Sequence, residues 1–201
     1  MALLFAKNNS LSAVTALPAA VSGGGLNLIS TQTASSSSTI DFTSGIDSTY
    51  KEYIFKFINI HPSADGSQFL FNLSADTGSN YNVTKTTTAF RSFHSEDDSA
   101  TGLAYYTGGD LAQSTDFQRF ADSLGNDNDQ SLSGTFTLFN PSSTTFVKHF
   151  IANVNYSYDA DYSLQYFMAG YGNTTSAINA IQFKMNSGNI DSGTITLYGI
   201  N

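Results

Sequence analysis

The feature that most constrains the fold of this chain is the alternation of apolar and polar residues in several short runs. Its last 24 residues, Ile178 to Asn201, hold two such runs around a short polar segment, Asn186 to Ser192. Successive side chains of a β-strand point to opposite faces of a sheet, so alternation indicates strands buried on one side. The polar segment contains Gly and Asn residues that suit a turn. We therefore predict a closing β-hairpin that buries Ile195 and Leu197.

The composition favours β structure in the rest of the chain as well. Charged residues make up 12% of the sequence, and Glu52 and Glu96 are its only glutamates. Long exposed helices are normally rich in Glu, Lys, Arg and Ala, whereas this chain is dense in Ser, Thr, Asn and Gly. The 16 Phe and 11 Tyr supply side chains that sheet faces favour. A length of 201 residues suits one substantial β domain.

The strand signals recur along the chain without helices between them. Tyr53 to Ile60 is apolar on both faces and is predicted to be a central strand. Gln68 to Ser74 follows a turn at Asp65 and Gly66, and we expect it to be the antiparallel neighbour of that strand. About eight to ten strands are expected in total. The pattern predicts an all-β fold, namely an antiparallel β-sandwich of the jelly-roll type.

One acidic segment departs from the strand pattern. Between Glu96 and Asp129 there are eight acidic residues against one base, Arg119. Within this segment, residues 116 to 124 place three apolar side chains at helical spacing. The sequence is compatible with either a short helix or a loop at these residues.

The first 25 residues differ from the remainder of the chain. They carry one charge, Lys7, and end in three consecutive glycines that suit a hinge. Their large apolar residues follow no clean period, so we predict a docking arm that orders on a partner or a neighbouring subunit, with a ragged tail as the alternative. Residues 26 to 201 then form a single sandwich domain. The arm residues expected to dock are Leu3, Leu4, Phe5, Leu11, Val14, Leu17 and Val21.

Charge and hydropathy argue against several classes of partner. A net charge of −8 and a pI near 4.5 disfavour binding to nucleic acid or to an anionic membrane surface. No apolar run is long enough for a transmembrane helix, and the N-terminus does not have the pattern of a signal peptide. We expect neither a nucleic-acid partner nor membrane insertion. The absence of cysteine rules out disulfides and thiolate metal sites.

Motifs for catalysis or cofactor binding are not found. His61, His94 and His149 have no partner at a metal-ligand spacing, and neither a GxSxG elbow nor a phosphate-binding glycine motif is present. The run Asp127 to Asp129 resembles part of a calcium loop, but it lacks the Gly and the Glu that such loops require, and a solvated loop is the better interpretation. We therefore expect no cofactor and no metal site.

Two pairs of neighbouring carboxylates could serve as the acid and the base of a glycosidase. These pairs are Asp97 with Asp98, and Asp159 with Asp161. Chance adjacency explains them better in a chain that has many Asp residues.

Tyrosines near turns are the candidates for ligand contact. A Tyr ring offers an apolar face with a polar hydroxyl, which suits sugar rings and protein partners alike, although Tyr also fills half-buried strand positions. The candidate ligand-facing residues are Tyr105, Tyr106, Tyr158 and Tyr162.

Two phrases resemble a known family: LISTQTASSSSTIDFTSGIDSTYKEYIFKFINIHPSADGSQFLF and INAIQFKMNSGNIDSGTITLYGI. They are similar to small virion proteins of tailed phages, particularly marine phages and cyanophages. The resemblance covers roughly residues 26 to 201 and implies a β-sandwich carried on the particle surface, with a variable N-terminal part. It implies no active residues.

The expected function is therefore that of a non-enzymatic virion protein. It would be a head-decoration or tail-fibre-like subunit, assembled in the host cytoplasm, homo-oligomeric and in contact with capsid, neck or tail proteins. A receptor-binding fibre tip that recognises host surface glycans is one alternative. A polysaccharide-degrading enzyme is the other.

Overall fold

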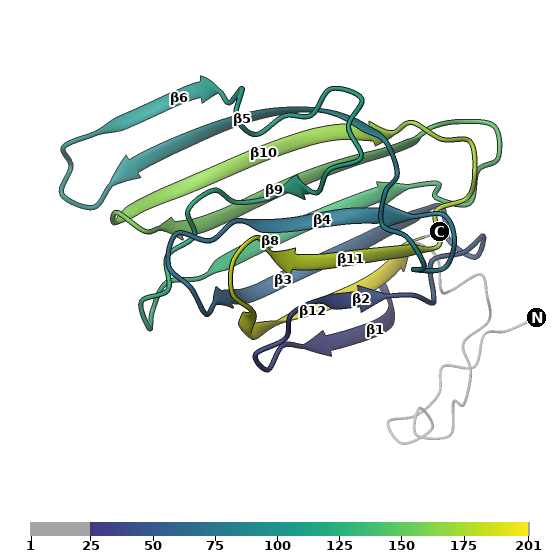
Figure 1. Ribbon diagram of the computed structural model, residues 1–201, viewed down its shortest axis with the longest axis horizontal. Helices are drawn as coiled ribbons and strands as arrows, with labels where there is room; N and C mark the ends of the chain where they lie inside the picture. Colours follow the sequence, from purple (N-terminus) through teal and green to yellow (C-terminus); the bar gives the residue numbers. More distant parts are fainter. Residues whose placement is uncertain (1–24, 201) are drawn as a thin grey trace, which may run out of the picture.

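The computed structural model describes residues 25–200, which form twelve β-strands in two antiparallel sheets (Figure 1). The strands are β1 (Asn27–Thr33), β2 (Ile40–Phe42), β3 (Glu52–Pro62), β4 (Phe69–Ser74), β5 (Lys85–Ser95), β6 (Thr101–Tyr105), β7 (Gln118–Arg119), β8 (Leu132–Phe139), β9 (Lys148–Tyr158), β10 (Tyr162–Gly172), β11 (Ala180–Met185) and β12 (Ile190–Ile200). The predicted antiparallel β-sandwich is confirmed. The predicted number of strands was too low, because β6 and β7 are short and carry little alternation.

The two sheets differ in size. The large sheet has eight strands in the order β1-β12-β3-β8-β9-β10-β5-β6, and the small sheet has four in the order β2-β11-β4-β7. The chain passes between the sheets repeatedly, as in a jelly roll. The small sheet covers the part of the large sheet around β3 and β8, whereas β5 and β6 extend beyond it (Figure 1). We call the covered side of the large sheet its inner face and the opposite side its outer face.

Phenylalanine rings fill the space between the sheets. From the large sheet, Phe55 and Phe57 of β3 lie 5.4 Å, centroid to centroid, from the ring of Phe183 on β11. Phe71 of β4 lies 4.7 Å from Phe136 of β8. All of these rings are fully buried. Edge-to-face and offset contacts of this kind add to the free energy gained by removing the rings from water.

The predicted terminal hairpin is wrong. β11 pairs with β2 and β4 in the small sheet, whereas β12 pairs with β1 and β3 in the large one, so the two strands face each other across the core. The predicted apolar faces hold nevertheless: Phe183, Ile195 and Leu197 are buried. Alternation indicates which side of a strand is buried, but a hairpin and a pair of strands from opposite sheets show the same alternation.

The predicted pairing of β3 with β4 is also wrong. β3 is central, as expected, but its neighbours are β12 and β8, and β4 lies in the other sheet. The chain leaves the large sheet after Pro62, and β4 returns on the opposite side of the core. β4 is buried at every position because β11 and β7 flank it and the large sheet lies beneath it.

Residues 116 to 124 do not form a helix, which was one of the two predicted alternatives for them. Gln118 and Arg119 form β7 at the edge of the small sheet, where they pair with Leu70 and Phe71. Of the apolar residues that suggested a helical face, Phe120 and Leu124 are buried in the core from an irregular segment, whereas Phe117 is only half-buried. Tertiary packing overrides the local spacing here.

Candidate functional site

A concave pocket lies on the inner face of the large sheet at one end of β5, β9 and β10. Its volume is about 360 Å³. We call it the inner pocket, and its lining residues are Arg91, Phe93, Tyr158, Ala160, Tyr162 and Leu164. Small-ligand sites are commonly concave, largely apolar and of this size, with a few polar groups that orient the ligand.

Strand register brings the lining residues together. Phe93 of β5 is paired with Leu164 of β10, and Tyr162 is paired with Tyr158 across the β9–β10 turn. Arg91 and Phe93 have the same parity along β5 as the fully buried Ala89, so their side chains share the inner face.

The aromatic walls of the inner pocket contact one another through ring edges. The ring of Tyr162 lies 5.7 Å from that of Phe93 and 5.8 Å from that of Tyr158, with interplanar angles of 71° and 87°. The ring of Phe93 also lies over Gly102 of β6, where a Cβ atom would come within 2.6 Å of the ring. A larger residue at position 102 would push Phe93 out of its place in the pocket wall.

Arg91 supplies the only cationic side chain among the residues that line the inner pocket. Its guanidinium lies 4.0 Å from the ring centre of Tyr106 and 3.6 Å from a carboxylate oxygen of Asp122. The side chain of Arg91 is 28% exposed. A cation–π contact and a long ion pair therefore hold the guanidinium beside the pocket.

Asp122 contacts both Arg91 and Tyr106. Its carboxylate accepts hydrogen bonds from the Tyr106 hydroxyl and from Arg119, the latter at 3.2 Å. Its backbone N–H donates to the hydroxyl of Tyr156. Burial raises the pKa of Tyr106, and the hydrogen bond to Asp122 raises it further, so this phenol stays protonated.

The four predicted ligand-facing tyrosines separate into three places. Tyr158 and Tyr162 line the inner pocket. Tyr106 lies behind the pocket, where it stacks on Arg91. Tyr105 pairs with Phe90 on the outer face and is exposed, with its hydroxyl bonded to Asp110.

Sequence reasoning missed Ala160 in the β9–β10 turn and three lining residues on strands, namely Arg91, Phe93 and Leu164. Their parity along β5 and β10 could have identified the shared face, but the pairing of these two strands is needed to place the residues side by side.

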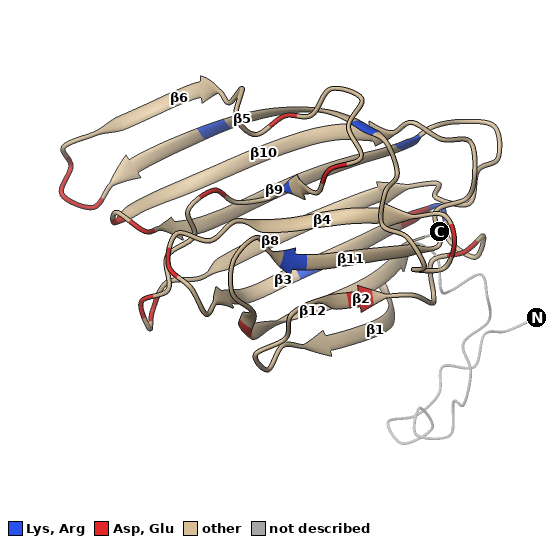
Figure 2. Cartoon of the chain, viewed as in Figure 1, with Lys and Arg blue, Asp and Glu red and all other residues tan. Residues whose placement is uncertain are grey.

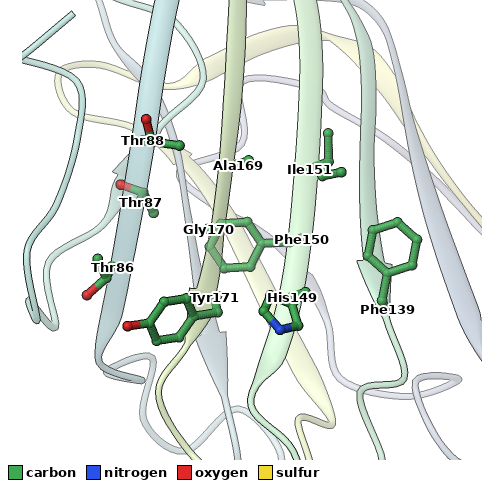
Figure 3. Close-up of a pocket in the computed structure, with 10 residues that line it drawn as sticks. All are labelled: Thr86, Thr87, Thr88, Phe139, His149, Phe150, Ile151, Ala169, Gly170 and Tyr171. Carbon is green, nitrogen blue, oxygen red and sulfur yellow. The ribbon is translucent and has the colours of Figure 1, made fainter.

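A second depression crosses the outer face at the opposite end of the same strands (Figure 3). Its floor is Ala169 and Gly170 of β10, whose small size leaves the space open, and its walls include Tyr171, Ile151 and Phe139. We call this depression, with a volume of about 450 Å³, the outer groove. Its lining is mainly apolar, which suits a protein surface better than a polar ligand.

The remaining sequence candidates are dispersed. His61 bonds the backbone carbonyl of Gln130, His94 lies 3.1 Å from Asp98, and His149 lies in the outer groove. Within residues 25–200 no three His, Cys, Asp or Glu side chains are grouped so that they could hold a metal ion.

Acidic residues lie mostly in turns and loops rather than on the sheet faces (Figure 2). The predicted carboxylate pairs Asp97–Asp98 and Asp159–Asp161 fall in the exposed turns that follow β5 and β9. The run Asp127–Asp129 is likewise an exposed loop, closed by a hydrogen bond from the backbone of Gln130 to that of Asp127.

Comparison with known proteins adds no assignment to this geometry. No protein-family model matches the sequence, and no curated protein matches it significantly. In residues 25–200 there is also no helix with the length and hydropathy needed to cross a bilayer. The seven predicted docking residues of the arm, from Leu3 to Val21, lie outside the described residues.

Proposed function

We propose that this chain is a non-enzymatic structural subunit on the surface of a tailed-phage virion. It is assembled in the host cytoplasm and docks on other virion proteins through residues 1–25 as a head-decoration or fibre-like subunit. The proposal combines the resemblance of residues 26–201 to virion proteins with one feature of the fold, the large apolar side chains that are exposed on the outer face of the large sheet.

The outer face exposes several large apolar side chains among its polar ones. An antiparallel sheet with one wet side usually alternates between buried apolar and exposed polar residues. Here Leu103 and Ile151 point outward with 72% and 53% of their surfaces exposed, and Phe90 stacks on Phe167 at 4.8 Å on the same side. A subunit that packs against copies of itself or other particle proteins would cover such a face.

Removal of the arm tests the docking role. A variant lacking residues 1–25 should fold but should no longer be incorporated into purified particles, because the sandwich would keep its core and lose its anchor. Circular dichroism checks folding, and immunoblotting of purified particles measures incorporation. Unchanged incorporation would refute the arm as anchor.

Sedimentation of outer-face variants tests self-association. Ile151→Glu should shift the full chain toward monomer, because it replaces an exposed apolar side chain of the outer face with a charge. Ser187→Glu, in the exposed turn between β11 and β12 and away from the outer face, is the control that should leave the assembly unchanged. Equal behaviour of the two variants would argue against the outer face as an interface.

A receptor-binding fibre tip is the second candidate function. The observation that favours it is the meeting of Tyr158 and Tyr162 in one concave pocket with a cationic side chain. In a glycan-array or host-cell binding assay, Tyr162→Ala should lose binding and Tyr105→Ala, on the outer face, should keep it. A parent chain that binds no glycan and no cell would exclude this function.

A further inference from the structure

We propose that the inner pocket binds a single carboxylated sugar residue of the hexuronate type, with the sugar ring against Phe93 and Tyr162 and the carboxylate on Arg91. This inference rests on the second candidate function, glycan recognition, and assigns to it a site and a ligand class.

The shape and lining of the pocket suit one sugar ring. A volume of about 360 Å³ lies at the small end of the range for ligand sites and admits one ring rather than an extended chain segment. Sugar rings carry patches of C–H groups that pack on aromatic faces, while tyrosine hydroxyls at the edge exchange hydrogen bonds with sugar hydroxyls. Phe93, Tyr158 and Tyr162 provide these surfaces in the lining of the pocket.

Arg91 determines the charge of the ligand. Its 3.6 Å separation from Asp122 is longer than a hydrogen bond, so this ion pair does not satisfy the donors of the guanidinium. The cation–π contact with Tyr106 holds the guanidinium in place before a ligand arrives. A planar carboxylate accepts two parallel hydrogen bonds from such a fork, whereas a neutral sugar hydroxyl accepts one.

The charge of the whole chain strengthens the argument for a specific anion site. A net charge of −8 repels polyanions in general, so a carboxylated sugar would not be held by non-specific attraction. The other residues that line the pocket are apolar or aromatic, so Arg91 is the group in the lining that can bind an anion. Discrimination between acidic and neutral sugars follows from the Arg91 contact alone.

Saturation-transfer NMR and calorimetry on the full chain test the proposal, with sodium glucuronate and glucose as probes. Glucuronate should bind with a dissociation constant at least tenfold lower than that of glucose, and an oligouronate should compete with it. Arg91→Met should remove the tenfold preference, and Arg91→Lys should restore only part of it. Tyr162→Ala should weaken both sugars, whereas Tyr105→Ala should behave like the parent chain.

The outcomes separate this inference from the function on which it rests. Equal binding of glucuronate and glucose, or a preference that survives Arg91→Met, overturns the acidic-sugar assignment and leaves glycan recognition standing. Binding lost in Arg91→Met, with an unchanged melting temperature, supports the assignment. No binding of either sugar or of the oligouronate also overturns the acidic-sugar assignment, whereas glycan recognition itself is excluded only if the glycan array and the host cells show no binding.

Discussion

The amino group of Lys85 lies in the interior, and among residues 25–200 no carboxylate is within hydrogen-bond distance of it. Its side chain is fully buried, and its Nζ donates to Oδ1 of Asn72 at 2.5 Å and to the carbonyl of Val83 at 2.8 Å. Burial lowers the pKa of Lys85 from 10.5 to about 8, although the charge of Asp116 partly opposes the shift. A polar group at this depth is tolerated because it is hydrogen-bonded, and the bond to Asn72 joins β5 of the large sheet to β4 of the small one.

This burial predicts a pH dependence of stability. Between pH 8 and about 10 the unfolded chain binds more protons at Lys85 than the folded chain does, so the free energy of unfolding should rise with pH, by on the order of 3 kcal/mol if the full shift were expressed. Lys148 adds to the trend, because burial lowers its pKa too. Above about pH 10 the trend should reverse, because burial raises the pKa of Tyr156 and Tyr166 and keeps them protonated only in the folded state.

Thermal melts from pH 7 to 11 check this prediction. The parent chain should melt at a higher temperature near pH 9.5 than at pH 7.5, and Lys85→Met should flatten the rise. Lys51→Met, at an exposed position, is the control that should keep it. A parent chain whose melting temperature falls steadily from pH 7.5 would contradict the assignment to Lys85.

At the scale of elements, β12 depends on its inward-facing residues. Ile195 and Leu197 are fully buried between β1 and β3, in contact with the core. Leu197→Asp should prevent soluble folding, because an unpaired buried carboxylate costs about 4 kcal/mol or more, close to the whole stability of many domains. Soluble yield and far-ultraviolet circular dichroism measure the effect.

Leu28→Asp on the adjacent strand β1 is the matched control, because Leu28 is exposed. It should remain soluble and folded. A stable, folded Leu197→Asp variant would mean that β12 has the opposite face inward.

Individual strands were predictable from the sequence, but their partners were not. Alternation is a local property, and it correctly indicated β3 and the buried faces of β11 and β12. Whether β11 and β12 join in one sheet depends on how the rest of the chain packs, which alternation does not record. The same limit applies to the inner pocket. Tyr158 and Tyr162 stood out near a turn, whereas Arg91 and Phe93 reach them only through the pairing of β5 with β10.

At the scale of the whole molecule, Phe120 connects the two sheets. This ring, from the irregular segment after β7, lies 4.7 Å from Phe71 in the small sheet and 5.1 Å from Phe57 in the large one. Phe120→Ala should lower the free energy of unfolding by about 3–5 kcal/mol, because it leaves a cavity where both layers meet. Urea unfolding followed by tyrosine fluorescence measures the change.

Phe146→Ala provides the control for Phe120→Ala. Phe146 lies in an exposed loop, so its loss should change stability by less than about 0.5 kcal/mol. Similar costs for the two variants would show that the segment after β7 does not contribute to a shared core.

The position of β12 between β1 and β3 sets the order in which the domain can be completed during synthesis. β1 emerges from the ribosome first, yet its partner in the large sheet is β12, and Asn27 bonds to Gly199 across 172 residues of sequence. Until β12 has been translated, β1 has no partner and β3 has an open edge, both able to pair with other chains. Long-range closure of this kind slows folding, so both edges stay unpaired until the last strand of the chain has been made.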